Sequence, residues 1–354
     1  MWLLLKREVK NYLKNPLLWL GIASGVLMIF LNVRPYLNIH YLREGETIVY
    51  DEPETYGDAD VYCGYVPTEE GLRRGIWEEK IQEILISVFG MDNDEAQSVI
   101  NEMKGMDVSA ACVHLEGYGF YGAYNDYVHT AYRKGTREEI NAYIAEKLEN
   151  RTFSYYFSRK FADFAGVFMG FFATVFLSVL FMQDTRRNTY ELLHTKPVSA
   201  EKYVAGKVGG GFAVCLITLA ALNLIFFGIC LVSTGSSGFE VRLTDFLLAS
   251  CFYILPNMLM IVSVYSLVSL LFKSPLPAVP FLFLYIVYSN MGSGNAEGIY
   301  GYYGMPLAIM VRFPGQFFDT APPPMVLSNQ CFLILAAICI IFLSMQIWKR
   351  RRVY

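Results

Sequence analysis

The chain contains 354 residues, of which 54% are apolar and 17% are charged, and its formal net charge is −3. So high an apolar fraction is unusual in a soluble protein of this length, and several runs approach the ~20 apolar residues that a helix needs to cross a hydrocarbon core of ~30 Å. The composition therefore disfavours an ordinary soluble protein and predicts an all-α integral membrane protein.

Residues 1–15 are predicted to form an amphipathic helix. At a period of about 3.6 residues, apolar side chains share one arc of this helix. Its cations lie on another arc: Lys6, Arg7, Lys10 and Lys14. Such a helix lies in the membrane interface with its cations near anionic headgroups; a plain cationic anchor is the alternative. Asn15-Pro16 ends the helix, and residues 16–33 are expected to form span 1.

The polar insertion at residues 34–160 follows span 1. It holds 23 acidic and 13 basic residues, a net charge of −10, which leaves +7 on the rest of the chain. It is long enough to be a small domain, and we expect a mostly helical one outside the cell. Its start, to about residue 66, is predicted to be irregular or short-stranded. Three helices are expected after it: residues 69–89, a helix capped by Asp92 and Glu95, and residues 137–149, capped by Thr136 and Glu139.

Two further features of the insertion concern its side chains. Its aromatic residues are interpreted mainly as domain core rather than as a ligand site: Tyr118, Phe120, Tyr121, Tyr124 and Tyr127. Cys63 and Cys112 would be able to form a disulfide outside the cell, but two unpaired thiols are the favoured interpretation.

Residues 161–354 are expected to contain spans 2–6. The predicted spans are Phe164–Met182, Val208–Val232, Phe246–Phe272, Leu276–Met291 and Cys331–Trp348. Pro256 predicts a kink in the middle of span 4. Ser199 is expected to cap the helix that continues into span 3.

Charge at the chain ends decides the number of spans. The last span ends in Lys349-Arg350-Arg351-Arg352, which belongs on the cytoplasmic side, as do the N-terminal cations. Both termini inside require an even number, so the short fifth run is counted and six transmembrane helices are predicted. Residues 292–328 would then be external, either as broken half-helices or as a loop packed on the bundle.

The docking loop, residues 183–207, joins spans 2 and 3. It carries Arg186-Arg187, then Thr189-Tyr190-Glu191-Leu192-Leu193, then Pro197-Val198-Ser199 and finally Gly206-Lys207. This order of motifs resembles the corresponding loop in permeases of the type-2 ATP-binding-cassette (ABC) exporter family. Asn188 and Lys196 depart from the family pattern, where a glycine and a small or hydroxylated residue are common.

The resemblance implies a function and a set of partners. It implies that a short helix at residues 189–195 docks on a separate cytoplasmic ABC ATPase subunit, which binds ATP and Mg, and that two permease chains together form the path for an exported substrate. The implied partner-docking residues are Arg186, Arg187, Thr189, Glu191, Leu192, Leu193, Pro197 and Lys207. No cofactor is expected in this chain, and the expected location is a bacterial plasma membrane, with lipids but no nucleic acid as further partners.

The composition of the spans gives an independent argument. None has a charged residue in its middle, which disfavours an ion-coupled transporter. The chain lacks a phosphate-binding Gly-x-x-x-x-Gly-Lys-Ser/Thr loop and any paired catalytic motif, so neither an ATPase nor another enzyme is predicted. The alternative is a membrane-anchored sensor or assembly protein that works through its acidic external domain. The substrate, whether peptide, lipid or drug-like, is left open.

Overall fold

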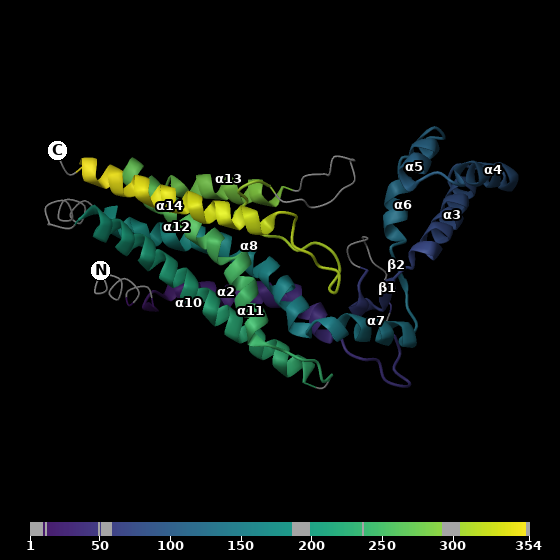
Figure 1. Cartoon of the computed structure of the whole chain (residues 1–354), viewed down its shortest axis with the longest axis horizontal. Helices are drawn as coiled ribbons and strands as arrows, with labels where there is room; N and C mark the ends of the chain where they lie inside the picture. The colour runs from purple at the N-terminus through teal and green to yellow at the C-terminus, as the bar shows by residue number, and fades with distance from the viewer. Residues whose placement is uncertain are drawn as a thin grey trace. The chain divides into compact units, whose positions relative to one another are not determined.

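The computed structural model describes residues 10, 13–48, 50, 59–185, 199–235, 237–291 and 305–351. The chain divides into two compact units, drawn in Figure 1. One unit consists of residues 39–150. The other combines residues 1–38 with residues 151–354, so the polar unit is an insertion into a chain segment that is otherwise apolar.

The larger unit is a bundle of apolar helices, and most of the long helices run along a common direction (Figure 1). Its elements are α2 (Pro16–Val33), the 3-10 helix η1 (Arg34–Asn38), α8 (Phe153–Thr185), α10 (Ala200–Thr234), α11 (Leu243–Tyr253), α12 (Leu255–Phe272), α13 (Ala278–Asn290) and α14 (Val326–Arg351).

Five stretches among the described residues are long and apolar enough to cross a membrane: α2 with η1, most of α8, α10, α11 with α12, and α14. The fifth predicted span corresponds to α13, which has only 13 residues. At 1.5 Å per residue it extends about 20 Å, less than the ~30 Å of a bilayer core. The six-span count therefore stays a prediction.

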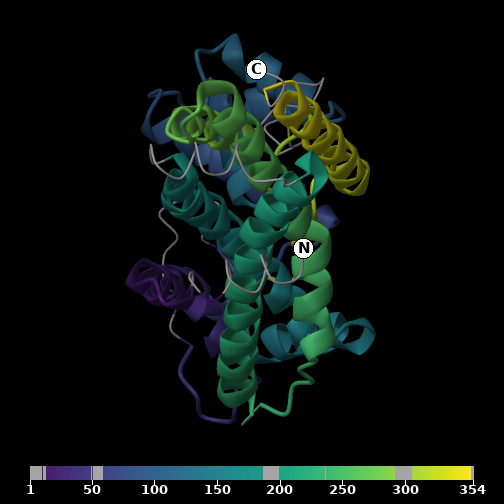
Figure 2. The same ribbon diagram turned by 90° about the vertical axis from the view of Figure 1, so that its left-hand side faces the viewer.

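Helix α8 is the centre of the bundle. In its most apolar stretch 72% of the residues are buried, against 22% in α2 and in α14. It packs against α2, α10, α11, α12 and α13. The view turned by 90° shows α2 and α14 on separate sides of the unit (Figure 2). Helices α2 and α14 therefore present most of their apolar surface outward.

Helix α8 begins at Phe153, earlier than the predicted start of span 2 near residue 164. Aromatic packing explains the difference. The ring of Phe153 stacks on that of Phe239 with centroids 5.2 Å apart, and Phe161 packs on Phe226 at 5.2 Å. Residues 151–160, which the sequence groups with the insertion, therefore belong to the helical unit.

The predicted kink at Pro256 is confirmed. Helix α11 ends at Tyr253 and α12 begins at Leu255, with Ile254 between them at φ −118° and ψ −46°. Proline has no N–H to donate and its fixed φ suits the first turn of a helix, so the chain restarts a helix here instead of continuing the old one.

The described residues of the smaller unit form a two-stranded sheet, five α-helices and one 3-10 helix. Its elements are η3 (Val61–Cys63), β1 (Tyr65–Pro67), α3 (Glu70–Ser87), α4 (Asn93–Met103), α5 (Val108–Glu116), α6 (Ala123–His129), β2 (Tyr132–Lys134) and α7 (Arg137–Asn150). The strands are antiparallel, with Val66 opposite Arg133. The three predicted helices are confirmed as α3, α4 and α7. Asp92 is the N-cap residue of α4, but its carboxylate accepts a hydrogen bond from the amide of Asn93 rather than from that of Glu95, so the predicted capping box is not the cap observed.

This unit has its own hydrophobic core between α3, α4, α5 and α6. Trp77 of α3 is fully buried, and its indole N–H donates to the carbonyl of Ala123 at 2.9 Å. Of the predicted aromatic core residues, Phe120 is buried and Tyr124 and Tyr127 pack against the core. Tyr118 and Tyr121 are exposed and are not part of it. Cys63 and Cys112 are both buried, and they are not joined in a disulfide.

Residues 39–150 are expected to fold on their own because their core is built from their own side chains. Expressed alone, this unit should give a helical circular-dichroism spectrum and a cooperative thermal transition. The spectrum of a disordered chain would contradict this expectation and would show that the core depends on the helical unit.

The capping box of α7 forms as predicted. The amide of Thr136 donates to Glu139 at 2.8 Å, and the amide of Glu139 donates to the hydroxyl of Thr136 at 3.3 Å. The Glu139 carboxylate also accepts from the Arg133 guanidinium at 2.6 Å. The hydrogen bond from Arg133, followed by that from the Thr136 amide, lowers the pKa of Glu139 to about 2.

Glu139 should therefore stabilise the small unit in a pH-dependent way. Because its folded pKa is below its ordinary value of 4.5, its contribution is complete above about pH 4.5 and is lost as the pH falls toward 2. Glu139→Gln should lower the melting temperature at pH 7, and the difference from wild type should shrink at pH 3. Glu149→Gln on the same helix is the matched control, and equal effects of the two variants at both pH values would refute the assignment.

Candidate functional site

The docking loop is the site predicted from sequence, and most of it lies outside the described residues. Outside them are Arg186, Arg187, Thr189, Glu191, Leu192, Leu193 and Pro197, together with Lys6 and Arg7 of the predicted interfacial helix. Lys10 and Lys14 are described and exposed. Lys207 is described within α10. The geometry of the site therefore comes from the helix ends on either side of residues 186–198.

Two long helices carry the ends of this loop. Helix α8 ends at Thr185, and α10 begins at Ala200 after the N-cap residue Ser199. The Ser199 hydroxyl accepts a hydrogen bond from the amide of Lys202 at 3.4 Å, so the predicted cap is confirmed. Since α8 and α10 pack against each other, the loop joins neighbouring helices of the bundle core.

Lys207 lies in the second turn of α10, where its side chain is buried. It is only 9% exposed, and its ammonium nitrogen lies 6.0 Å from the ring centroid of Phe181 on α8. A cation over an aromatic ring is attracted by the electron density of its face, and more strongly where water is excluded. Lys207 thus connects α10 to α8 at the base of the docking loop.

The end of α14 is joined to the start of α10. The rings of Tyr203 and Trp348 stack with centroids 3.8 Å apart and an interplanar angle of 16°. Trp348 is 2% exposed, and Lys349 lies 3.6 Å from the Glu201 carboxylate. Three helices therefore have an end beside the docking loop: α8, α10 and α14. Sequence reasoning treated Trp348 only as the end of a span, because nothing local relates it to Tyr203.

A second cluster of charged residues lies on the first turns of α8. Lys160 is 4% exposed and donates to the carbonyls of Phe313, at 3.2 Å, and of Gly315. The Asp163 carboxylate, with its side chain 7% exposed, pairs with Arg312. These charges fasten the segment before α14 onto the central helix.

Two further contacts complete this cluster. Arg159 donates to the carbonyl of Thr320 at 2.6 Å, and Arg312 donates to the side-chain oxygen of Asn290 at 3.1 Å. The sequence placed Arg159, Lys160 and Asp163 at the entrance of span 2 without partners. The partners of these three residues lie about 150 positions further along the chain, so no local pattern could predict them.

The segment held by this cluster, residues 305–325, is irregular. Its apolar side chains are buried against the bundle, among them Ile309, Met310, Phe313 and Phe317. Of the two arrangements expected for residues 292–328, the described part therefore corresponds to a packed segment, and the half-helices are not formed in residues 305–325.

Comparison with known proteins identifies the family. A family model described as ABC-2 family transporter protein matches residues 2–348. No curated protein and no solved structure matches the chain significantly. The family match covers both units, including the insertion that the resemblance in the docking loop did not reach. Together with the membrane-spanning helices, it shows that the chain belongs to the ABC-2 transporter permease family, as a multi-pass membrane subunit of an ABC transporter.

Proposed function

We propose that this chain is the permease subunit of an ABC exporter powered by a separate cytoplasmic ATPase. The observation that carries the proposal is the family match over residues 2–348. Permeases of this family are transport subunits that usually have no ATPase site of their own. ATP and Mg are accordingly assigned to the partner subunit.

The docking loop is the proposed contact with that ATPase. Leu192 and Leu193 would be the apolar anchors in a groove of the partner, and Glu191 would pair with a cation there. Arg186 and Arg187 would hold the loop at the headgroups. The geometry that supports this proposal is the convergence of α8, α10 and α14 beside the loop, because a displacement of the loop would act directly on the bundle core.

The proposed topology has six spans and cytoplasmic termini, with residues 34–160 and 292–328 outside the cell and residues 183–207 inside. It follows from the lysine and arginine distribution. Cysteines introduced singly at positions 196 and 350 should resist a membrane-impermeant thiol reagent in intact cells, and one at position 121 should react. Labelling at 196 or 350 from outside would overturn the topology.

A second permease is the other proposed partner. It would be identical or related to this chain, and the substrate path would lie between the two chains in a bacterial plasma membrane.

The independent core of residues 39–150 favours one alternative function, that of a membrane-anchored sensor that works through this unit. One measurement distinguishes the exporter from the sensor. An exporter permease should copurify with an ATPase and stimulate its ATP hydrolysis in vesicles, whereas a sensor should do neither.

A further inference from the structure

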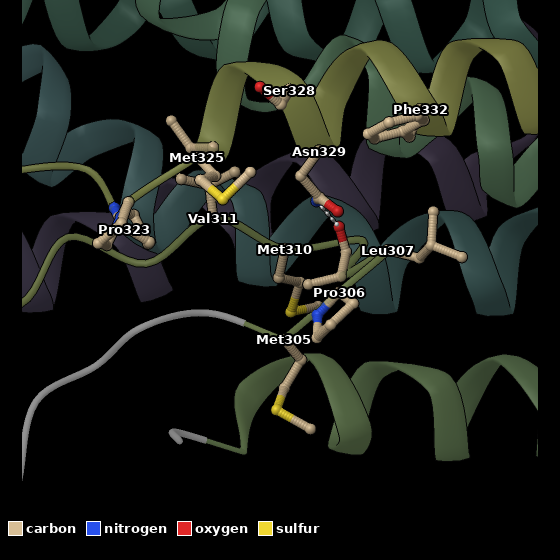
Figure 3. Close-up of a pocket in the computed structure, with 13 residues that line it drawn as sticks. Met305, Pro306, Leu307, Met310, Val311, Pro323, Met325, Ser328, Asn329 and Phe332 are labelled. Atoms are coloured by element: carbon tan, nitrogen blue, oxygen red, sulfur yellow. Dashed lines mark hydrogen bonds between the residues drawn. The ribbon is translucent and has the colours of Figure 1, made fainter. Parts of the chain in front are cut away.

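The helical unit contains an apolar cavity apart from the docking loop. Its volume is about 290 Å³, and it lies between residues 305–311, residues 323–326 and the first turns of α14 (Figure 3). Its walls include Met305, Leu307, Met310, Val311, Met325 and Phe332. A volume close to ~300 Å³ is at the lower end of the range for small-molecule sites and far exceeds an ordinary packing defect.

The walls offer little to a polar ligand. Ser328 and Asn329 are the polar residues among them, and the Asn329 amide donates to the carbonyl of Ala308 at 3.0 Å, drawn as a dashed line in Figure 3. The methionines add flexible, polarisable side chains that adapt to an apolar ligand. Apolar cavities of this kind hold hydrocarbon in preference to water.

The cavity is preformed, because side chains of α13, together with Asn329 of α14, fix one of its walls. Tyr285 and Tyr288 of α13 donate to the carbonyls of Leu307, at 2.6 Å, and Pro306, at 3.0 Å. The amide of Ile309 donates to the Ser289 hydroxyl at 3.0 Å. The backbone of residues 306–309 is therefore held by side chains of α13 and α14, although residues 305–325 form no regular structure.

Backbone strain is concentrated at the same place. Leu307 and Met325 both have φ of 58°, the left-handed region that is unfavourable for residues with a side chain. Only one other non-glycine residue in the described part of the chain, Lys273, has positive φ. Strain of this kind persists only where neighbouring contacts impose it, and it clusters at ligand sites.

The surroundings of the cavity indicate what enters it. Helix α14 is a membrane-spanning candidate with little buried surface. Phe332, which lines the cavity, is 60% exposed, and Leu335, about one turn further along the helix, is 59% exposed. An exposed apolar face on a spanning helix borders lipid hydrocarbon. The cavity is continuous with this face through Phe332, which belongs to both.

We propose that the cavity is a binding site for one acyl chain of a membrane phospholipid. The hydrocarbon chain is the apolar molecule that a bilayer supplies at this face, and it needs no hydrogen-bonding partner. A preformed wall means that binding does not require the site to be ordered first, which favours occupancy. The site would keep one lipid in a fixed position against α14 and residues 305–311.

The test uses the full chain in nanodiscs that contain a phospholipid with a photoactivatable diazirine on its acyl chain. After illumination, mass spectrometry should find the adducts enriched in residues 305–311 and 325–332 over the remaining exposed face of α14. Ser328→Phe, which fills the cavity, should lower this labelling severalfold. Phe332→Ala, which removes a wall, should lower it about threefold, the effect of losing part of an apolar contact.

Phe342→Ala is the matched control, because Phe342 lies on the same helix, is 59% exposed against 60% for Phe332, and does not line the cavity. It should leave labelling at the cavity unchanged. Equal melting temperatures of the variants would show that they are folded; if Ser328→Phe is not folded, the Phe332 and Phe342 pair decides alone.

Two results would overturn the proposal. Labelling spread evenly over the exposed face of α14, and insensitive to both cavity variants, would indicate ordinary annular lipid. Efficient oxidative cross-linking between two copies through Met325→Cys, in a background without the exposed Cys251, Cys331 and Cys339, would indicate that a second copy covers the cavity. Since lipid labelling needs no ATPase, the outcome is independent of the proposed transport function.

Discussion

Leu193→Asp is expected to abolish substrate-stimulated ATP hydrolysis by the complex of this permease with its ATPase, while the permease is still inserted and folded. If Leu193 fills a groove on the ATPase, its burial contributes roughly 1.5–3 kcal/mol. Loss of that contribution, and the cost of burying a carboxylate in its place, should weaken docking by at least about tenfold. The measurement is copurification of the ATPase and its hydrolysis rate in vesicles.

The control for this variant is Leu72→Asp. Leu72 is a 54% exposed leucine on α3 of the small unit, so the same change of side chain there should leave docking and hydrolysis as in wild type. Normal copurification and hydrolysis with Leu193→Asp would mean that residues 183–207 are only a basic connection between two helices. The exporter proposal would then lose the residues on which its mechanism depends.

Arg312→Met is expected to destabilise the helical unit by on the order of 3 kcal/mol, because removal of one partner leaves the other charge buried. The Asp163 side chain is 7% exposed and would lose its cation, while Lys160 and Arg159 are engaged with backbone carbonyls. Asp163→Asn should cost less, since the Arg312 side chain is 35% exposed and keeps its contact with Asn290. Thermal unfolding in detergent compares the variants.

The double variant Asp163→Leu with Arg312→Met tests the cause of that loss. Because no charge is then left unpaired, it should recover most of the stability that Arg312→Met alone removes. A double variant less stable than both single variants would show that the pair itself, rather than the uncompensated carboxylate, holds residues 305–325 in place.

The membrane helices and the helices of the small unit were predictable because their signals are local. Apolar runs of sufficient length, the proline at position 256 and the capping box of Thr136 and Glu139 each act within a few residues. Local signals also explain the error at the start of α8. Lys160 and Asp163 look like the end of a membrane span, and only their distant partners make them interior residues.

The site was less predictable than the fold. The docking motif was found through a resemblance to a family, whereas the contact between Tyr203 and Trp348 joins residues with no shared local pattern. The wall of the cavity could not be decided from local signals. Its apolar residues suited either half-helices or a packed loop, and the difference lies in hydroxyl and amide groups from α13 and α14, which satisfy the backbone of residues 306–309 and hold it in an irregular path.

Helix α14 runs without interruption from the wall of the cavity to the start of α10. It has 26 residues, so it is about 39 Å long, and its sequence contains neither glycine nor proline at which it would bend. Trp348 fixes one end to α10, and Asn329 fixes the other to Ala308. If such a helix moves as one body, a tilt imposed where α10 begins displaces Asn329 sideways at the opposite end, together with the wall to which it is bonded.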